Sequence, residues 1–214
     1  MDAFHERLAR VGLAAADRYG FALAGGYAVQ AAGFLQRPSE DVDLFTAWNR
    51  RGEFGEAVSA VIDAYHADSL DVRVDLQYET FARLMVTDRQ DASKVELGVD
   101  WRANEPILMA IGPVLHPDDA VANKMAALYG RALARDFIDV DAALRSGRYD
   151  RESVLRLAER ADSGFDRDIF ADAIGQAELL DADDFGEYGT TGEVLDDLRA
   201  RFAGWRAELR GQRN

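Results

Sequence analysis

The sequence predicts an α/β half followed by a helical half, and three observations indicate this division. Two amphipathic helical patterns lie in the first 70 residues, around short apolar segments that suit buried strands. Three segments between residues 71 and 100 alternate polar and apolar residues, as strands with one buried face do. After Pro117 the apolar spacing is helical. We therefore expect an α/β core in residues 1–115 and a helical part in residues 116–214.

The elements of the first half follow from apolar periodicity and from the positions of glycine and proline. The expected helices cover residues 4–19, 27–34 and 53–66, and the expected strands cover residues 21–24, 42–45, 71–78, 81–87 and 94–100. Gly25 and Gly26 end the first strand, and Pro38 stops the helix that follows from continuing. One further short strand is expected within residues 107–115.

The second half is expected to consist of helices. Asp118 suits an N-cap, and residues 120–144 form either one long helix or two helices broken near Asp136. Two further helices are expected at residues 153–161 and 194–209. Segment 162–197 is strongly acidic, with Arg167 as its only basic residue, and is expected to be a solvated face.

Composition narrows the class of protein. The chain has 214 residues, no cysteine and no apolar run of membrane-spanning length, so we expect no disulfide and no membrane partner. Its N-terminus lacks an apolar signal core, which predicts cytoplasmic residence. A formal net charge of −14 argues against generic binding of nucleic acid but allows a local basic site.

The most informative motif joins Gly25-Gly26 to Asp41-Val42-Asp43. Alternate residues of a strand point the same way, so Asp41 and Asp43 should project together from one face. Two carboxylates suit a hard cation such as Mg²⁺ or Mn²⁺, which shares oxygen ligands with substrate phosphates. The glycines allow the backbone to approach a phosphate. Together these residues predict transfer of a nucleotide from a nucleoside triphosphate (NTP).

A third carboxylate is expected near this pair. Glu96 is the best candidate, because its neighbours in the 94–100 strand are apolar and should face the other side. Asp75 and Asp100 are rivals for the same role. Three carboxylates would suit a site in which metal ions orient the nucleophile and stabilise the leaving oxygen.

Basic residues of the second half offer a phosphate site. On one continuous helix, offsets of seven and eleven residues return to nearly the same face, so Lys124, Arg131 and Arg135 would form a basic stripe. Such a stripe could bind triphosphate oxygens. The alternative is a solvated face on which Arg135 pairs with Asp139 at i+4.

Two further sets of residues have less specific roles. Ser39 lies two residues before Asp41 and could cap a helix or strand. Trp48, Trp101 and Trp205 are expected to pack in the interior rather than to stack on bases.

The chain resembles the AbiEii/AbiGii-type nucleotidyltransferase toxins, including the MenT-like toxins, of the DNA polymerase β-like nucleotidyltransferase superfamily. Three blocks within residues 21–144 carry the resemblance: Gly25-Gly26 with Asp41-Val42-Asp43, Lys94-Val95-Glu96-Leu97, and Lys124 to Leu128 leading into Arg131 and Arg135-Asp136-Phe137-Ile138-Asp139. The last block is the most specific, whereas the first fits any member of the superfamily.

The resemblance implies a fold and a set of active-site residues. The fold would be a mixed sheet with flanking helices, followed by a helical C-terminal part that completes the site. Asp41 and Asp43 would bind Mg²⁺, with Glu96 as the third acid, and Lys124 would contact the NTP phosphates. Asp136, alone or with Asp139, would complete the essential set, and spacing does not decide which of the two faces the site.

The resemblance also implies a biological role. Such toxins add nucleotides to the 3′ end of tRNA, which blocks aminoacylation and translation, and a separately encoded antitoxin neutralises them. In MenT-like relatives a hydroxyl residue beside the metal carboxylates is phosphorylated, and Ser39 matches that position.

Some features depart from the family pattern and leave alternatives open. Gly26 stands where the superfamily often has serine, so phosphate contact could rest on backbone N–H groups or Tyr27. Any tRNA site must be local, drawn from Arg37, Arg50, Arg51, Arg131, Arg135 and the arginine-rich C-terminal tail. The alternatives are a small-molecule nucleotidyltransferase, such as an antibiotic-modifying enzyme, and a non-catalytic binding protein with the same fold.

Overall fold

The computed structural model describes residues 1–211, so Arg213 of the arginine-rich tail lies outside the described residues. These residues form two compact units. The first, unit 1, contains residues 1–32 and 38–117, and the second, unit 2, contains residues 33–37 and the chain from Asp118 onward. No helix within residues 1–211 is long and apolar enough to cross a membrane.

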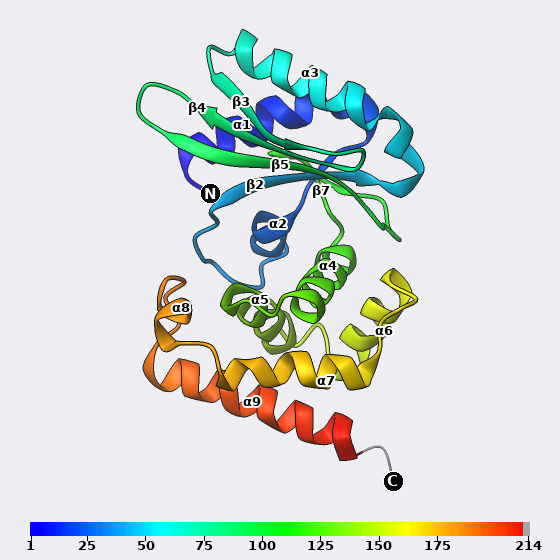
Figure 1. Ribbon diagram of the computed structural model, residues 1–214, viewed down its shortest axis with the longest axis vertical. Helices are drawn as coiled ribbons and strands as arrows, with labels where there is room; N and C mark the ends of the chain where they lie inside the picture. Colours follow the sequence, from blue (N-terminus) through cyan, green and yellow to red (C-terminus); the bar gives the residue numbers. More distant parts are fainter. Residues whose placement is uncertain (212–214) are drawn as a thin grey trace. The chain divides into compact units, whose positions relative to one another are not determined.

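Unit 1 is built on a seven-stranded sheet with the order β3-β4-β5-β2-β1-β7-β6 (Figure 1). The strands are β1 (Ala22–Leu23), β2 (Asp41–Ala47), β3 (Asp71–Gln77), β4 (Phe81–Thr87), β5 (Ala92–Asp100), β6 (Ile107–Met109) and β7 (Gly112–Val114). The β2/β5 and β1/β7 pairs are parallel and the other pairs are antiparallel. The expected mixed sheet is therefore confirmed.

Helices flank this sheet, and Figure 1 shows α1 and α3 on one face of it with α2 on the other. The helices of unit 1 are α1 (Ala3–Ala15), α2 (Gly25–Ala31) and α3 (Phe54–Ala67), with 3-10 helices at η1 (Asp17–Tyr19) and η2 (Trp48–Glu53). The buried Tyr65 hydroxyl donates to the Leu8 carbonyl at 2.9 Å and so ties α3 to α1. A Cβ on Gly12 would lie 2.6 Å from Leu44, so α1 packs closely on β2.

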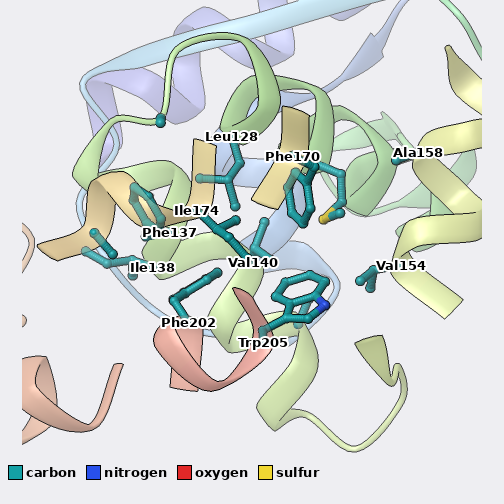
Figure 2. Close-up of a cluster of buried hydrophobic side chains, with 14 of the residues drawn as sticks. Leu128, Phe137, Ile138, Val140, Val154, Ala158, Phe170, Ile174, Phe202 and Trp205 are labelled. Carbon is teal, nitrogen blue, oxygen red and sulfur yellow. The ribbon is translucent and has the colours of Figure 1, made fainter. Parts of the chain in front are cut away.

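Unit 2 is helical, as the sequence predicts. Its elements are α4 (Pro117–Gly130, whose first residue is assigned to unit 1), α5 (Ala134–Arg145), α6 (Arg151–Ala161), α7 (Arg167–Gly175), η3 (Gln176–Glu178), α8 (Ala182–Gly186) and α9 (Gly192–Gly211). Large side chains from several helices meet in its core, among them Phe137, Phe170, Phe202 and Trp205 (Figure 2). The predicted packing role of Trp205 is confirmed, since this side chain is buried.

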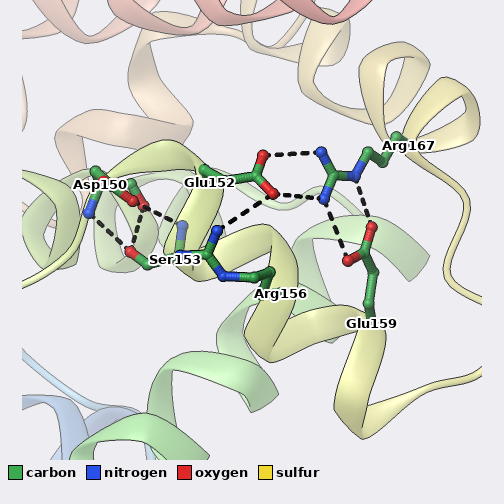
Figure 3. Close-up of polar contacts among 6 residues, drawn as sticks. All are labelled: Asp150, Glu152, Ser153, Arg156, Glu159 and Arg167. Atoms are coloured by element: carbon green, nitrogen blue, oxygen red, sulfur yellow. Dashed lines mark hydrogen bonds and ion pairs between the residues drawn. The ribbon is translucent and has the colours of Figure 1, made fainter.

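The acidic segment 162–197 contributes to this unit rather than forming only a solvated face. It contains α7 and α8, whose Phe170 and Phe185 are fully buried. Arg167 donates to Glu152 at 2.8 Å and to Glu159 at 2.6 Å, which ties the start of α7 to α6 (Figure 3). The one basic residue of the segment thus stabilises the helix packing.

Several predicted boundaries differ from the structure. The first helix ends at Ala15, and Gly25 and Gly26 begin α2 instead of preceding it. Residues 107–115 hold two short strands rather than one. Residues 120–144 form two helices, and the break falls at residues 131–133, where Ala132 has a φ of 49°. A left-handed residue cannot continue a right-handed helix, so α4 ends there.

Candidate active site

Three carboxylates meet on one face of the sheet in unit 1. Strands β2 and β5 are parallel, and their register pairs Asp41 with Lys94 and Asp43 with Glu96. One carboxylate oxygen from each of Asp41, Asp43 and Glu96 lies within 4.8 Å of the others. The intervening Val42 is fully buried, as alternation along the strand requires.

The two rival acids lie elsewhere. Asp75 pairs with Arg73 on its own strand at 2.9 Å, and Asp100 accepts the Trp101 backbone N–H at 2.7 Å. Within the described chain, the carboxylate cluster includes neither of them. The structure therefore brings together the three acids that the sequence favours.

Two cations lie beside this carboxylate cluster, and sequence reasoning missed the first of them, Arg83. Arg83 on β4 donates to Glu96 at 2.8 Å, and this hydrogen bond raises the pKa of Arg83. Lys94 Nζ lies 3.9 Å from Asp41. Arg83 follows from the register of β4 with β5, which places it directly opposite Glu96. These cations partly offset the repulsion among the three acids.

Gly25 is required by a close approach to Asp43. A Cβ built on Gly25 would lie 1.6 Å from Asp43 Oδ2, and Gly25 has a φ of 57°. The Asp43 carbonyl accepts the Ala24 N–H at 2.8 Å, which holds the start of α2 against β2. Any larger residue at Gly25 would displace the Asp43 carboxylate. Gly26 is buried as the second residue of α2.

A buried hydrogen-bond network adjoins this region. The His5 ring lies 2.5 Å from the Tyr27 hydroxyl through Nδ1 and 2.6 Å from the Ser93 hydroxyl through Nε2. Burial lowers the pKa of His5, although the charges of Asp2 and Asp41 act in the opposite direction. The phenol of Tyr27, considered above as a phosphate contact, is therefore engaged by His5. This network joins residues far apart in sequence, so no motif reveals it.

Ser39 lies in the short segment of unit 1 that begins at Pro38 and leads into β2 at Asp41. Its side chain is partly buried, and one residue, Glu40, separates it from the first metal-site candidate, Asp41. The structure thus leaves Ser39 outside the strand itself.

Unit 2 contains a second charged cluster, centred on Asp139. Lys124 Nζ on α4 lies 2.9 Å from Asp139 Oδ2 on α5. Arg37 binds both oxygens of the same carboxylate at 2.7 Å through Nε and Nη2. Burial alone would raise the pKa of Asp139, but Lys124 and Arg37 outweigh it and the pKa is lowered. Arg37, one of the arginines from which a tRNA site is expected to be drawn, is buried and pairs with this acid.

The predicted basic stripe is wrong because the helix breaks at residues 131–133. Arg131 lies in that break and binds Asp136 through two hydrogen bonds of 2.9 Å. Asp136, whose side chain is fully buried, also accepts the Leu133 N–H at 3.2 Å. The alternative pairing of Arg135 with Asp139 is also wrong, since Lys124 and Arg37 are the cations within reach of Asp139 in the described residues.

The predicted packing of two tryptophans is wrong as well. Trp48 is 55% exposed and Trp101 is 36% exposed. Each residue directly follows the last residue of a strand, β2 for Trp48 and β5 for Trp101, and its apolar character did not place it in the core.

The class of protein follows from a comparison with known protein families, which identifies a nucleotidyltransferase. A family model described as the nucleotidyl transferase AbiEii toxin of type IV toxin–antitoxin systems matches residues 8–213, and the chain belongs to this family. The resemblance predicted from the motifs is therefore confirmed. A search of curated protein sequences gave no match.

Several solved structures are similar to this chain, and two of them are described here. MenT4, a nucleotidyltransferase toxin from Mycobacterium tuberculosis, superposes with a TM-score of 0.61 at 19% identity, over 94% of this chain and 82% of that chain. JHP933 from Helicobacter pylori superposes with a TM-score of 0.54 at 18% identity, over 98% and 93% of the two chains. At this identity the likeness shows the fold.

Family membership fixes the general chemistry. The protein is a nucleotidyltransferase enzyme, and its family implies an NTP substrate, a divalent metal ion and a cognate antitoxin. The carboxylate cluster fits the metal requirement, because its three side chains offer the hard oxygen donors that such ions prefer.

Proposed function

We propose that the protein is a Mg²⁺-dependent toxin that transfers a nucleoside monophosphate from an NTP to the 3′ hydroxyl of tRNA. Pyrophosphate is released, and the modified tRNA is no longer aminoacylated, so translation stops. The observation that carries the proposal is the cluster of Asp41, Asp43 and Glu96 in a chain of the AbiEii toxin family. Because NTPs and tRNA are found in the cytoplasm, the proposal places the reaction there.

The reaction exchanges one bond at phosphorus for another. The acceptor hydroxyl oxygen bonds to the α-phosphorus of the NTP, and the bond from that phosphorus to pyrophosphate breaks. Asp41 and Asp43, with Glu96, would hold Mg²⁺ or Mn²⁺. A bound ion of this kind supplies charge neutralisation to the triphosphate. Asp43 accepts the hydroxyl proton, directly or through Glu96.

The surrounding residues orient these groups. Gly25 leaves room for the Asp43 carboxylate, and Arg83 fixes the carboxylate of Glu96 at 2.8 Å. The roles of Gly25 and Gly26 in approaching the triphosphate belong to the same proposal. Positioning of this kind supplies most of the catalysis in phosphoryl transfer.

Residues of unit 2 are assigned to the NTP phosphates in this proposal. Lys124 is the main phosphate ligand, and Arg131 and Arg135 supply further positive charge. Asp139 is a positioning residue, because it binds Lys124 and Arg37 together and faces no solvent. Asp136 acts likewise by holding Arg131.

A small-molecule acceptor is the second candidate, and the net charge of −14 favours it, since acidic surfaces attract cationic drugs. A single experiment separates the two. The protein is incubated with each α-labelled NTP and Mg²⁺, once with total tRNA and once with an aminoglycoside, and the labelled product is identified. Label at the tRNA 3′ end supports the proposal, whereas label only on the drug contradicts it.

Variants test the assignment of the metal site. Asp41→Asn and Asp43→Asn are each expected to abolish transfer, and chelation of the metal should do the same. Asp75→Asn is the matched control, because it removes a carboxylate from a nearby strand outside the cluster. Full activity in the Asp41→Ala, Asp43→Ala double variant would contradict the assignment of these residues to the metal site.

The proposal includes an off switch at Ser39. A phosphate there adds about −1.5 to −2 charges two residues from Asp41 and would repel the incoming triphosphate. Ser39→Glu should therefore transfer far less nucleotide than Ser39→Ala. Equal activity of the two variants, at equal thermal stability, would remove the switch from the proposal.

A further inference from the structure

A cleft in unit 1 lies at the other end of the strands that carry the metal-site acids. Asp41 and Asp43 are at the start of β2, whereas the cleft opens beyond Ala47 and Asp100, at the carboxyl ends of the parallel strands β2 and β5. Its volume is about 710 Å³. Ligands of open α/β sheets commonly bind at this kind of edge. The cleft plays no part in the chemistry described above.

Two exposed tryptophans line this cleft next to each other. Trp48 and Trp101 each directly follow residues that are paired in the sheet, Ala47 and Asp100. Neighbouring strands are about 4.8 Å apart, so the two residues leave the sheet side by side. Large aromatic side chains bury most of their surface in cores and interfaces, so two exposed indoles at a cleft indicate a ligand with flat apolar faces.

Arginines surround these rings. The Arg51 guanidinium lies 5.1 Å over the Trp48 ring and donates to the Trp48 carbonyl at 3.2 Å. The neighbouring Arg50 is paired with Glu53 at 3.3 Å. Arg50 and Arg102 line the cleft, and Arg102 is anchored by the Phe45 carbonyl at 2.7 Å. The lining thus offers two arginines to an anionic ligand, balanced by the two acids Asp17 and Glu105.

Two acids limit which anions can bind. Asp17 and Glu105 also line the cleft and would repel a ligand as densely charged as a triphosphate. An acidic peptide would meet the same repulsion and would make no use of the indole faces. A single strand of nucleic acid suits the cleft better, because bases stack on aromatic rings while arginines contact the few phosphates between them.

We infer that this tryptophan cleft binds single-stranded RNA, with bases stacked on Trp48 and Trp101 and a phosphate beside Arg51. The inference rests on the proposed function in one respect: the RNA is the acceptor itself, held at a point away from the reacting hydroxyl. From Asp43 to Trp48 is five residues along a strand, or about 17 Å.

Intrinsic fluorescence reports directly on this contact. The chain has three tryptophans, and Trp205 is buried, so quenching by a ligand reports Trp48 and Trp101. The full chain is titrated with an unstructured RNA of about 12 nucleotides, with the same RNA in a duplex, and with a polyglutamate peptide. The single strand should quench most, and its affinity should fall by about tenfold or more in the Trp48→Ala, Trp101→Ala variant.

Matched variants keep the test independent of folding. Tyr78→Ala removes an exposed aromatic ring of the same unit that does not line the cleft, and it should bind RNA as the wild type does. Trp48→Phe with Trp101→Phe keeps flat rings and should recover most of the affinity lost in the alanine variant. Wild-type affinity in the alanine variant, or quenching by the peptide but not by RNA, would overturn the inference.

A transfer assay separates this inference from the proposed function. The ratio of kcat/KM for full tRNA to kcat/KM for a trinucleotide acceptor should fall by about tenfold in the alanine variant. Transfer to tRNA with an unchanged ratio would overturn the inference that the cleft binds RNA, and it would leave the proposed function intact. Tryptophan-dependent RNA binding without transfer to any RNA would support the cleft and contradict tRNA as acceptor.

Discussion

Arg37 and Asp139 form a buried, two-point ion pair although they lie 102 positions apart in the chain. Both hydrogen bonds measure 2.7 Å, and the two side chains are 4% and 0% exposed. Lys124 binds the same carboxylate at 2.9 Å. Asp139 therefore fixes the positions of two cations at once, one of which is assigned above to the NTP phosphates.

Loss of the arginine should destabilise the protein strongly. Arg37→Ala leaves Asp139 buried with Lys124 as its remaining cation, so we expect a loss of about 3 kcal/mol in the free energy of unfolding. Urea denaturation of the full chain measures it. Arg10→Ala is the control, because its contacts with Glu6 and with the Ala110 carbonyl are exposed and their loss should cost under about 1 kcal/mol. Similar losses in both variants would contradict the structural role given to Arg37.

The Arg131–Asp136 pair should respond unequally to loss of its two members. Arg131 is 47% exposed and Asp136 is 0% exposed. Arg131→Ala would leave a buried carboxylate with little compensation, at a cost of about 3 kcal/mol. Asp136→Asn returns a half-exposed guanidinium to water and should cost only about 1 kcal/mol. Thermal unfolding ranks the two variants, and the reverse order would show that Asp136 is not held by Arg131.

Gly25 offers a test of the active-site geometry. Gly25→Ala places a methyl group where the Asp43 carboxylate now lies, and transfer should fall by about 100-fold. Gly33→Ala is the matched control: Gly33 also has a positive φ, of 79°, but a Cβ there meets nothing within 4 Å. That control should lose about 1–2 kcal/mol of stability and keep its activity. Equal transfer rates in the two variants would refute the crowding argument.

His5 should make stability depend on pH below neutrality. Burial lowers its pKa in the folded protein, despite the charges of Asp2 and Asp41, while the unfolded chain titrates near 6.5. The contribution of His5 to the free energy of unfolding is therefore complete above pH 6.5. It is lost as the pH falls from 6.5 through the pKa of His5 in the folded protein, by up to about 1.4 kcal/mol per pH unit.

Melting temperatures between pH 7.5 and 5 check this expectation. His5→Gln should flatten the profile, and His66→Gln, which changes an exposed histidine, should not. If the wild type and His5→Gln lose stability in parallel over this range, His5 is not the group responsible.

The carboxylate cluster could be predicted because it depends on local rules. Alternation along a strand places Asp41 and Asp43 on one face, and the same rule applied to its neighbour selects Glu96. What the sequence could not supply was the pairing of β2 with β5, which turns two separate patterns into one cluster. Arg83 was missed for the same reason, since its place opposite Glu96 depends on the register of β4.

The errors share a different cause. The basic stripe assumed a continuous helix, and apolar spacing did not reveal the left-handed Ala132 that ends α4. Partners such as Arg37 and Asp139 meet only through tertiary structure, which spacing along one helix cannot show. Trp48 and Trp101 were assigned to the core on residue type, and residue type alone does not decide burial at the end of a strand.

The assignment of residues 33–37 to the helical unit has a consequence for how the protein can be dissected. The chain passes from one unit to the other three times, after Ala32, Arg37 and Pro117. A single cut therefore cannot release either unit as an uninterrupted polypeptide. A fragment ending near residue 115 would contain segment 33–37 but not the helices of unit 2. Its Arg37 would then lack its ion-pair partner, Asp139. Truncation, domain exchange and split-protein designs must keep both halves together or replace this short excursion with a new loop.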